Sequence, residues 1–217
     1  MMFDVILFDL DGTLTDSADG IINSFVHALK HYGLPHDDRD ALRRIVGPPL
    51  PYSFSHFYGF SSEKTEEAVS IFREYYQKIG IFENKVYDGV PEMLAALKQA
   101  GFTLAVATSK PEVFAERILE RFGLASYFTA VAGATMDEKR TGKADVIRYA
   151  MKKLGISDAS RIVMVGDREH DILGAAAVGV TSIGVLYGYG DREELCRAGA
   201  DSLAETPQDV VSHILKK

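Results

Sequence analysis

Short apolar runs alternate with helical patterns along most of this chain, and this alternation is the feature that most constrains its fold. The runs are β-branched or apolar and end near Gly, Asp, Ser or Thr, as buried parallel strands do. The predicted strands are 3–8, 103–107, 127–133, 161–165 and 180–185, with a short edge strand at 201–204. The predicted helices are 91–101, 111–123, 143–155, 168–179 and 207–217. This order predicts an α/β fold with a doubly wound parallel sheet.

One segment interrupts the alternation. Residues 15–87 contain no strand pattern and predict helices at 17–32, 38–46 and 62–79, with a Pro-rich turn at 47–53. An insertion that follows the first strand leaves the sheet at the carboxyl end of that strand, where ligands bind in such folds. We therefore expect a core domain, residues 1–14 and 88–217, and an all-helical cap domain, residues 15–87.

Composition and charge argue against several classes of protein. The formal net charge is −7 and no basic block is present, which argues against binding to a nucleic acid polymer or an anionic membrane. The single cysteine, Cys196, excludes an intrachain disulfide. No apolar run approaches membrane-spanning length, and no basic segment precedes the first run. These features predict a cytoplasmic protein that is a monomer or a homodimer.

Carboxylates stand at the ends of two predicted strands. Asp9 and Asp11 follow the first strand in the stretch DLDGT, and Asp167 follows the strand 161–165, with Asp171 one helical turn later. Because the carboxyl ends of parallel strands share one edge, these distant residues converge there. Clustered carboxylates repel one another without a cation, and Mg²⁺ prefers oxygen ligands. The sequence therefore predicts a magnesium site at this edge.

Donors for an anion come to the same edge. Gly12 allows a sharp turn that brings backbone N–H groups near an anion. Thr108 offers a hydroxyl and Lys143 an ammonium, while Ser109 is the nearer candidate to cap the following helix. An anion pocket, a divalent metal and a carboxylate nucleophile indicate phosphoryl transfer through an aspartyl-phosphate. The second acid, Asp11, would protonate the leaving oxygen and then activate water.

Four stretches resemble, in order, the motifs of the haloacid dehalogenase-like phosphatase superfamily. They are DLDGTLTDS (9–17), VATSK (106–110), the lysine of TGKADVI (141–147) and GDREHD (166–171). The insertion resembles the helical cap of the phosphoglycolate phosphatase-like branch. The stretch 166–195 also resembles members described as phosphoglycolate phosphatases or 5′-nucleotidases.

The resemblance implies a role for each matched residue. Asp9 would be the nucleophile, Asp11 the acid and base, and Thr108 a hydrogen-bond donor to the phosphoryl group. Lys143 would stabilise the phosphorylated aspartate, and the phosphate-binding set would comprise Gly12, Thr108, Ser109 and Lys143. Mg²⁺ would bind the Asp9 carboxylate, the Asp11 backbone carbonyl and Asp167, with Asp171 supporting these ligands from behind.

The expected function is therefore a Mg²⁺-dependent phosphatase for a small phosphorylated metabolite such as phosphoglycolate. A 5′-nucleotidase is the nearest alternative, followed by a pyrophosphatase or a phosphomutase. A phospho-receiver switch also uses acids at strand ends, but it needs no cap, and the DxD arrangement argues against it.

Several other residues have open interpretations. Lys110 either lines the mouth of the site or is a solvated loop lysine, whereas Lys139 is interpreted as solvated. His170 is interpreted as a helix-surface residue. The loop LYGYG, residues 186–190, either rims the site or is a flexible glycine loop. In the cap, Arg43 and Arg44 either face the substrate or are surface charges, and the aromatic residues Phe54, Phe57, Tyr58 and Phe60 are expected to pack in the cap core or its seam.

Overall fold

The computed structural model describes residues 3–47, 50–137 and 139–216. The chain divides into two compact units, Met1–Asp16 with Val86–Lys217 and Ser17–Lys85. Along the chain, the first unit is interrupted after Asp16 and resumes at Val86, whereas the sequence placed these changes after residues 14 and 87. Within the described ranges, every helix is too short or too polar to cross a membrane.

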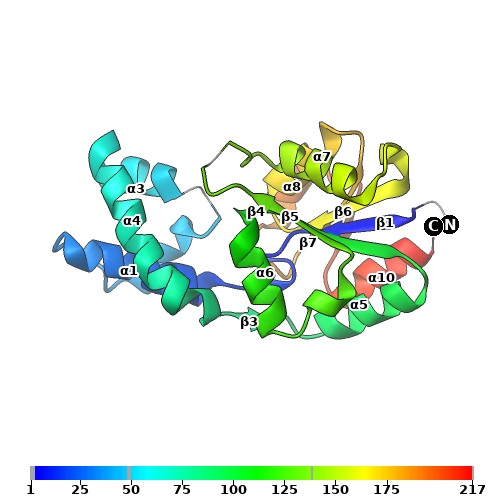
Figure 1. The fold of residues 1–217 in the computed structure, drawn as a ribbon, viewed down its shortest axis with the longest axis horizontal. Coiled ribbons are helices and arrows are strands. Elements are labelled where there is room, and N and C mark those ends of the chain that lie inside the picture. Colours follow the sequence, from blue (N-terminus) through cyan, green and yellow to red (C-terminus); the bar gives the residue numbers. More distant parts are fainter. Residues whose placement is uncertain (1–2, 48–49, 138, 217) are drawn as a thin grey trace. The chain divides into compact units, whose positions relative to one another are not determined.

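A six-stranded parallel sheet forms the centre of the first unit (Figure 1). Its strands are β1 (Val5–Phe8), β4 (Thr103–Pro111), β5 (Ala130–Ala134), β6 (Ile162–Gly166), β7 (Thr181–Val185) and β8 (Ser202–Ala204), in the order β5-β4-β1-β6-β7-β8. The chain builds outward from β1 to β4 and β5, then returns to β6 on the other side of β1. The strand order therefore reverses at β1, and the predicted doubly wound sheet is confirmed.

Helices cover both faces of this sheet. The helices α7 (Lys143–Leu154) and α8 (Glu169–Ala176) lie on one face, and α5 (Val90–Gln99), α6 (Glu112–Arg121) and α10 (Pro207–Leu215) lie on the other (Figure 1). Val5 and Leu7 of β1 pack in one buried cluster with Val146 and Ile147 of α7. Right-handed crossovers produce this arrangement, because each change of direction along the sheet moves the connecting helix to the opposite face.

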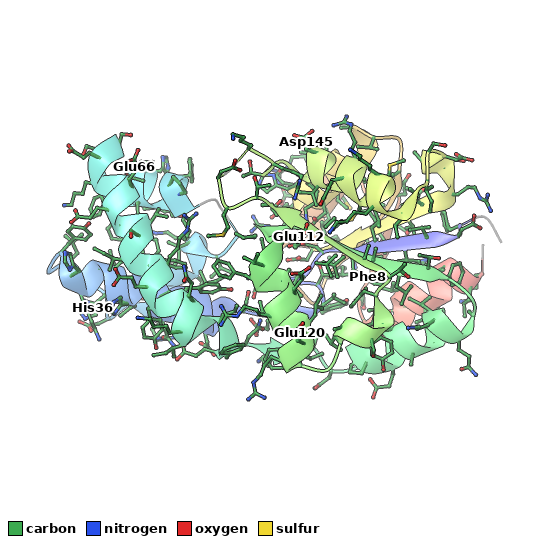
Figure 2. The ribbon with its side chains drawn as sticks, viewed as in Figure 1. Phe8, His36, Glu66, Glu112, Glu120 and Asp145 are labelled. Atoms are coloured by element: carbon green, nitrogen blue, oxygen red, sulfur yellow. The ribbon has the colours of Figure 1, made fainter. Side chains whose placement is uncertain are left out.

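The first strand is completely enclosed. All four of its residues, Val5, Ile6, Leu7 and Phe8, are at most 1% exposed. Side chains alternate along a strand, so Ile6 and Phe8 point to the face opposite α7. Phe8, labelled in Figure 2, makes an edge-to-face contact with Phe128 at 6.3 Å between ring centroids. Burial on both faces holds the end of β1 in a fixed position.

The second unit is helical, with an aromatic core. It contains α1 (Ala18–His31), α2 (Arg39–Leu42), α3 (Leu50–Tyr58) and α4 (Ser62–Lys78), and the short 3-10 turns η1 (Arg43–Ile45) and η2 (Gly80–Phe82). The Phe54 ring stacks on Phe25 at 4.2 Å and on Phe60 at 5.8 Å between centroids. Phe54 is fully buried, whereas Phe57 and Tyr58 are half-buried. Arg43 and Arg44 are exposed, and the Arg44 guanidinium lies over the Phe57 ring.

The inserted segment differs from the prediction in three places. The predicted Pro-rich turn at 47–53 instead contains the start of α3 at Leu50; Pro51 falls in the first helical turn, where a proline is tolerated, and residues 48–49 lie outside the described residues. The predicted helix 38–46 is one turn of α helix followed by η1. The segment is also not free of strands, because β2 (Thr15–Asp16) pairs with β3 (Lys85–Val86) where the chain leaves and re-enters the sheet unit.

The helix α9 (Arg192–Arg197) was not predicted. Asp191 caps it by accepting a hydrogen bond from the backbone N–H of Glu194 at 2.8 Å. The remaining 3-10 turns, η3 (Ala125–Tyr127) and η4 (Ala159–Arg161), lie just before β5 and β6.

Candidate active site

Asp9 stands at the carboxyl end of β1, and a buried lysine binds it. Lys143, the first residue of α7, places Nζ 2.9 Å from Asp9 Oδ1 and 2.6 Å from Asp171 Oδ1. The same ammonium donates to the Ala107 carbonyl at the end of β4, at 3.1 Å. The Lys143 side chain is 4% exposed. One lysine therefore forms ion pairs with acids that follow β1 and β6, while Asp9 Oδ1 and Asp171 Oδ1 themselves lack a well-aligned hydrogen-bond donor within the described part of the chain.

Asp167 follows β6 and is held on both oxygens. Its Oδ1 accepts a hydrogen bond from the Thr13 hydroxyl at 2.9 Å, and its Oδ2 accepts one from the backbone N–H of Tyr189 at 2.9 Å. The residue is fully buried. Asp171, in the first turn of α8, is 1% exposed, and its Oδ2 accepts from the backbone N–H of Arg168 at 3.1 Å. Both carboxylates are thus fixed in orientation.

Among the described residues, one group of acids has the geometry of a metal site. Asp9, Asp167 and Asp171 each offer an oxygen, and these atoms lie within 4.8 Å of one another. Burial raises the pKa of Asp9 to about 6; Lys143 opposes the rise and the charge of Asp171 adds to it. Burial also raises the pKa of Asp167, and the charges of Asp171 and Asp9 add to that rise. A single ammonium does not balance three carboxylates, so this oxygen-rich cluster fits a divalent cation.

Two glycines allow the backbone to approach Asp167 closely. Gly12 has φ +84°, and a Cβ there would lie 2.1 Å from Asp167 Oδ2. A Cβ on Gly188 would lie 2.3 Å from both Asp167 Cβ and the Gly12 carbonyl oxygen. A side chain at Gly12 would displace the Asp167 carboxylate, and one at Gly188 would displace either the loop or Asp167. The loop 186–190 therefore packs directly against the acid cluster.

The end of β4 contacts both acids of the DLD stretch. The Thr108 hydroxyl works against the rise in the pKa of Asp9, and it accepts a hydrogen bond from the backbone N–H of Lys110 at 3.2 Å. Lys110 Nζ lies 2.7 Å and 2.6 Å from the two carboxylate oxygens of Asp11. The Lys110 side chain is only 6% exposed and that of Asp11 is 22% exposed. Lys110 is therefore not a solvated loop lysine.

Other predicted residues lie apart from these contacts. Ser109 is exposed, and the predicted capping role is wrong, because β4 continues to Pro111 and Pro111 precedes the first residue of α6. His170 is also exposed. Lys139 has a side chain that is 84% exposed and pairs with Asp137 at 2.9 Å.

Three contacting residues were not assigned a role from the sequence alone. Thr13 stands in the quoted DGT stretch, so the signal was present. Lys110 was recognised as a candidate but not as a partner of Asp11. Tyr189 acts on Asp167 through its backbone N–H, and a backbone donor leaves no trace in residue type.

A family model described as haloacid dehalogenase-like hydrolase matches residues 6–185. A 5′-nucleotidase from Pseudomonas aeruginosa is 46% identical over 88% of this chain and 86% of its own. A tyrosine-protein kinase, PtkA, from Mycobacterium tuberculosis is 44% identical over 96% of this chain and 68% of its own. A phosphoglycolate phosphatase from Colwellia psychrerythraea is 35% identical over 90% of each chain.

The fold agrees with a solved structure. The crystal structure of a protein from Clostridium acetobutylicum, described as a predicted phosphatase, superposes with a TM-score of 0.94, is 46% identical and covers the whole of both chains. The resemblance indicated by four short motifs thus holds for residues 6–185, which the family model matches, and for the full length of the Clostridium protein. The chain belongs to the haloacid dehalogenase-like hydrolase family.

Proposed function

We propose that this protein is a Mg²⁺-dependent phosphatase that hydrolyses a small phosphate monoester, of the phosphoglycolate type, through an aspartyl-phosphate on Asp9. The observation that carries the proposal is the placement of Asp9: a carboxylate at the end of a buried strand, 2.9 Å from the ammonium of Lys143 and within 4.8 Å of two further acids. A nucleophile for phosphoryl transfer needs this combination of fixed position and compensating charge.

In the first step, the Asp9 carboxylate attacks phosphorus, the new Asp9 O–P bond forms and the ester O–P bond breaks. The Asp11 carboxyl group gives its proton to the departing alkoxide, which leaves as an alcohol. The Thr108 hydroxyl, already at Asp9, donates to a phosphoryl oxygen. Lys143 balances the negative charge that gathers around Asp9.

In the second step, water attacks the phosphorus of the aspartyl-phosphate. Asp11, now a carboxylate, takes a proton from that water, and the Asp9 O–P bond breaks to release phosphate. Asp9 returns to the carboxylate form, held again by Lys143. Rigid placement of Asp9 matters in both steps, because correct positioning supplies a large part of the rate in phosphoryl transfer.

The acid cluster supports a role for Mg²⁺. Asp9, Asp167 and the backbone carbonyl of Asp11 would hold the ion, and Asp171 would keep Lys143 in place beside Asp9. When bound, Mg²⁺ would neutralise charge on the phosphoryl oxygens and on the acids themselves.

A nucleoside 5′-monophosphate is the second candidate substrate. The observation that favours it is the 46% identity with the Pseudomonas aeruginosa 5′-nucleotidase, which is higher than the 35% identity with the Colwellia psychrerythraea phosphoglycolate phosphatase. Both substrates present the same phosphoryl group to Asp9, so the choice between them rests on the rest of the molecule.

The test is a phosphate-release screen with and without Mg²⁺. Its substrates are phosphoglycolate, nucleoside 5′-monophosphates, sugar phosphates and pyrophosphate. Release from a monoester that requires Mg²⁺ supports the proposal, and the ratio of kcat/KM values names the substrate class. Release only in the presence of a bisphosphate primer would instead indicate a phosphomutase. A parallel incubation with ATP and protein tyrosine, read by phosphotyrosine immunoblot, tests the activity in the name of the Mycobacterium relative, and we expect no transfer.

A further inference from the structure

Two buried lysines serve the acids of the site in different ways. Lys143 is shared among Asp9, Asp171 and the Ala107 carbonyl. Lys110 binds Asp11, with Nζ within 2.7 Å of both carboxylate oxygens. An ammonium only donates, so both carboxylate oxygens of Asp11 act as acceptors in this contact.

An incoming phosphoryl dianion needs donors, and the structure limits where they come from. The Lys143 ammonium is already surrounded, since Nζ lies 2.9 Å from Asp9 Oδ1, 2.6 Å from Asp171 Oδ1 and 3.1 Å from the Ala107 carbonyl oxygen. Removing Lys143 from Asp171 would leave a carboxylate that is 1% exposed without its cation, and an unpaired charge so deeply buried is costly. Asp11 is 22% exposed, so water can solvate it when it loses its lysine. The exchange that costs less free energy is therefore at Lys110.

Lys110 also lies two residues from Thr108, which influences Asp9. In the segment 108–110 at the end of β4, the Thr108 hydroxyl influences Asp9, and the Lys110 ammonium lies 2.7 Å from Asp11 Oδ1. The backbone N–H of Lys110 donates to that same hydroxyl at 3.2 Å. A phosphoryl group bonded to Asp9 and accepting from Thr108 would thus stand beside the lysine.

We propose that Lys110 is a ligand of the substrate phosphoryl group and that Asp11 occupies it in the free enzyme, so that substrate and Asp11 compete for one ammonium. This inference rests on the proposed function, because it assigns a further residue to the same phosphate site. Binding of the dianion transfers Lys110 from Asp11 to phosphoryl oxygens. The released Asp11 carboxylate is then free to turn away from Lys110.

The competition has a signature in phosphate binding that does not depend on turnover. Inorganic phosphate is titrated by calorimetry, at constant Mg²⁺, into the wild type, Lys110→Met, Asp11→Asn and the double variant. We expect Lys110→Met to weaken phosphate binding about tenfold or more, since a buried charge-assisted contact is lost. We expect Asp11→Asn to tighten binding several-fold, and this gain to disappear when Lys110 is also replaced.

The cycle separates competition from simple charge repulsion. If Asp11→Asn tightened phosphate binding equally with and without Lys110, the gain would come from removing a negative charge, and the inference would be wrong. Unchanged phosphate affinity in Lys110→Met would also overturn it. Lys139→Met, which removes an exposed lysine, is the matched control and should bind phosphate as the wild type does. Lys110→Gln replaces Lys110→Met in the cycle if the latter does not fold.

The outcome is independent of the proposed activity. If the phosphate-release screen failed while the cycle gave the expected coupling, the site would still bind phosphate through Lys110 and only the reaction would need revision. If the screen succeeded and the cycle gave no coupling, the proposed phosphatase activity would be kept, and Lys110 would not be a ligand of the phosphoryl group.

Discussion

The carboxyl edge of the sheet and the centre of the helical unit bury opposite kinds of side chain. In the sheet unit, the carboxyl edge of β1 encloses Asp9, Asp167, Asp171 and Lys143, each paired with a named partner. In the helical unit, the buried centre is aromatic, with Phe54 between Phe25 and Phe60. Burying a charge costs free energy that pairing only partly offsets, whereas buried aromatic area stabilises a fold directly. We therefore expect changes at the carboxyl edge of the sheet to lower activity and changes in the aromatic centre to lower stability.

The largest effect should come from Asp9→Asn. The amide cannot form the acyl phosphate, so turnover of the best substrate in the screen should fall by about 10⁴-fold or more. The fold should persist, because the amide keeps the volume and can still accept from Lys143. Phosphate release measures the first statement and circular dichroism the second. Retained turnover in a folded Asp9→Asn protein would remove Asp9 as the nucleophile.

Phe54→Ala should produce the opposite pattern. Truncating a fully buried aromatic ring costs about 3–5 kcal/mol of unfolding free energy. Native-state hydrogen exchange should show this loss in the helical unit, residues 17–85. The chemical step on Asp9 should continue in molecules that remain folded. Tyr52→Ala is the control on the same helix, because Tyr52 is 48% exposed, and it should change stability by no more than about 0.5 kcal/mol. Equal losses in the two variants would contradict the aromatic-core half of the comparison.

The buried carboxylates also predict a dependence of stability on pH. In protein stripped of metal, Asp9 has a pKa of about 6, against 3.8 without the fold. Between these values the folded state holds the proton more tightly than the unfolded state, so the Asp9 contribution to unfolding free energy falls as pH rises. Relative to Asp9→Asn, the wild type should lose roughly 2–3 kcal/mol from about pH 4 to about pH 6.

Urea unfolding of both proteins across this range, in the presence of a chelator, measures the difference. The raised pKa of Asp167 has the same sign, and it is present in both proteins, so the comparison isolates Asp9. Added Mg²⁺ competes with the proton and should therefore stabilise the wild type more above pH 6 than below it. A wild type that gained stability over Asp9→Asn with rising pH would show that Asp9 is not buried as the structure has it.

The sequence predicted the parts of this molecule that depend on local pattern. The apolar strand before Asp9 and the GD stretch before Asp171 specify strand ends, and a parallel sheet brings such ends together. The start of α3 was not predicted because the prolines of residues 47–53 indicate a turn, although Pro51 lies in the first helical turn, where a proline is tolerated. The burial of Lys110 could not be predicted, since it depends on Asp11, a residue 99 positions away. The hydrogen bond from Tyr189 to Asp167 could not be predicted either, because its donor is a backbone N–H that any non-proline residue supplies.

The smallest effect is expected from Tyr189→Phe, which separates the contact of the Tyr189 side chain from that of its backbone. The Tyr189 hydroxyl donates to Asp16 Oδ1 at 3.0 Å, and its loss should cost about 1 kcal/mol of unfolding free energy. The backbone N–H that holds Asp167 remains, so the Mg²⁺ concentration for half-maximal activity should stay within about threefold of wild type. Gly188→Ala is the counterpart, because its Cβ would lie 2.3 Å from Asp167 Cβ. That variant must move either the loop or the acid, and the same Mg²⁺ titration should shift by about tenfold or more. A large shift in Tyr189→Phe together with none in Gly188→Ala would mean that side chains, rather than the close backbone approach, hold Asp167 in position.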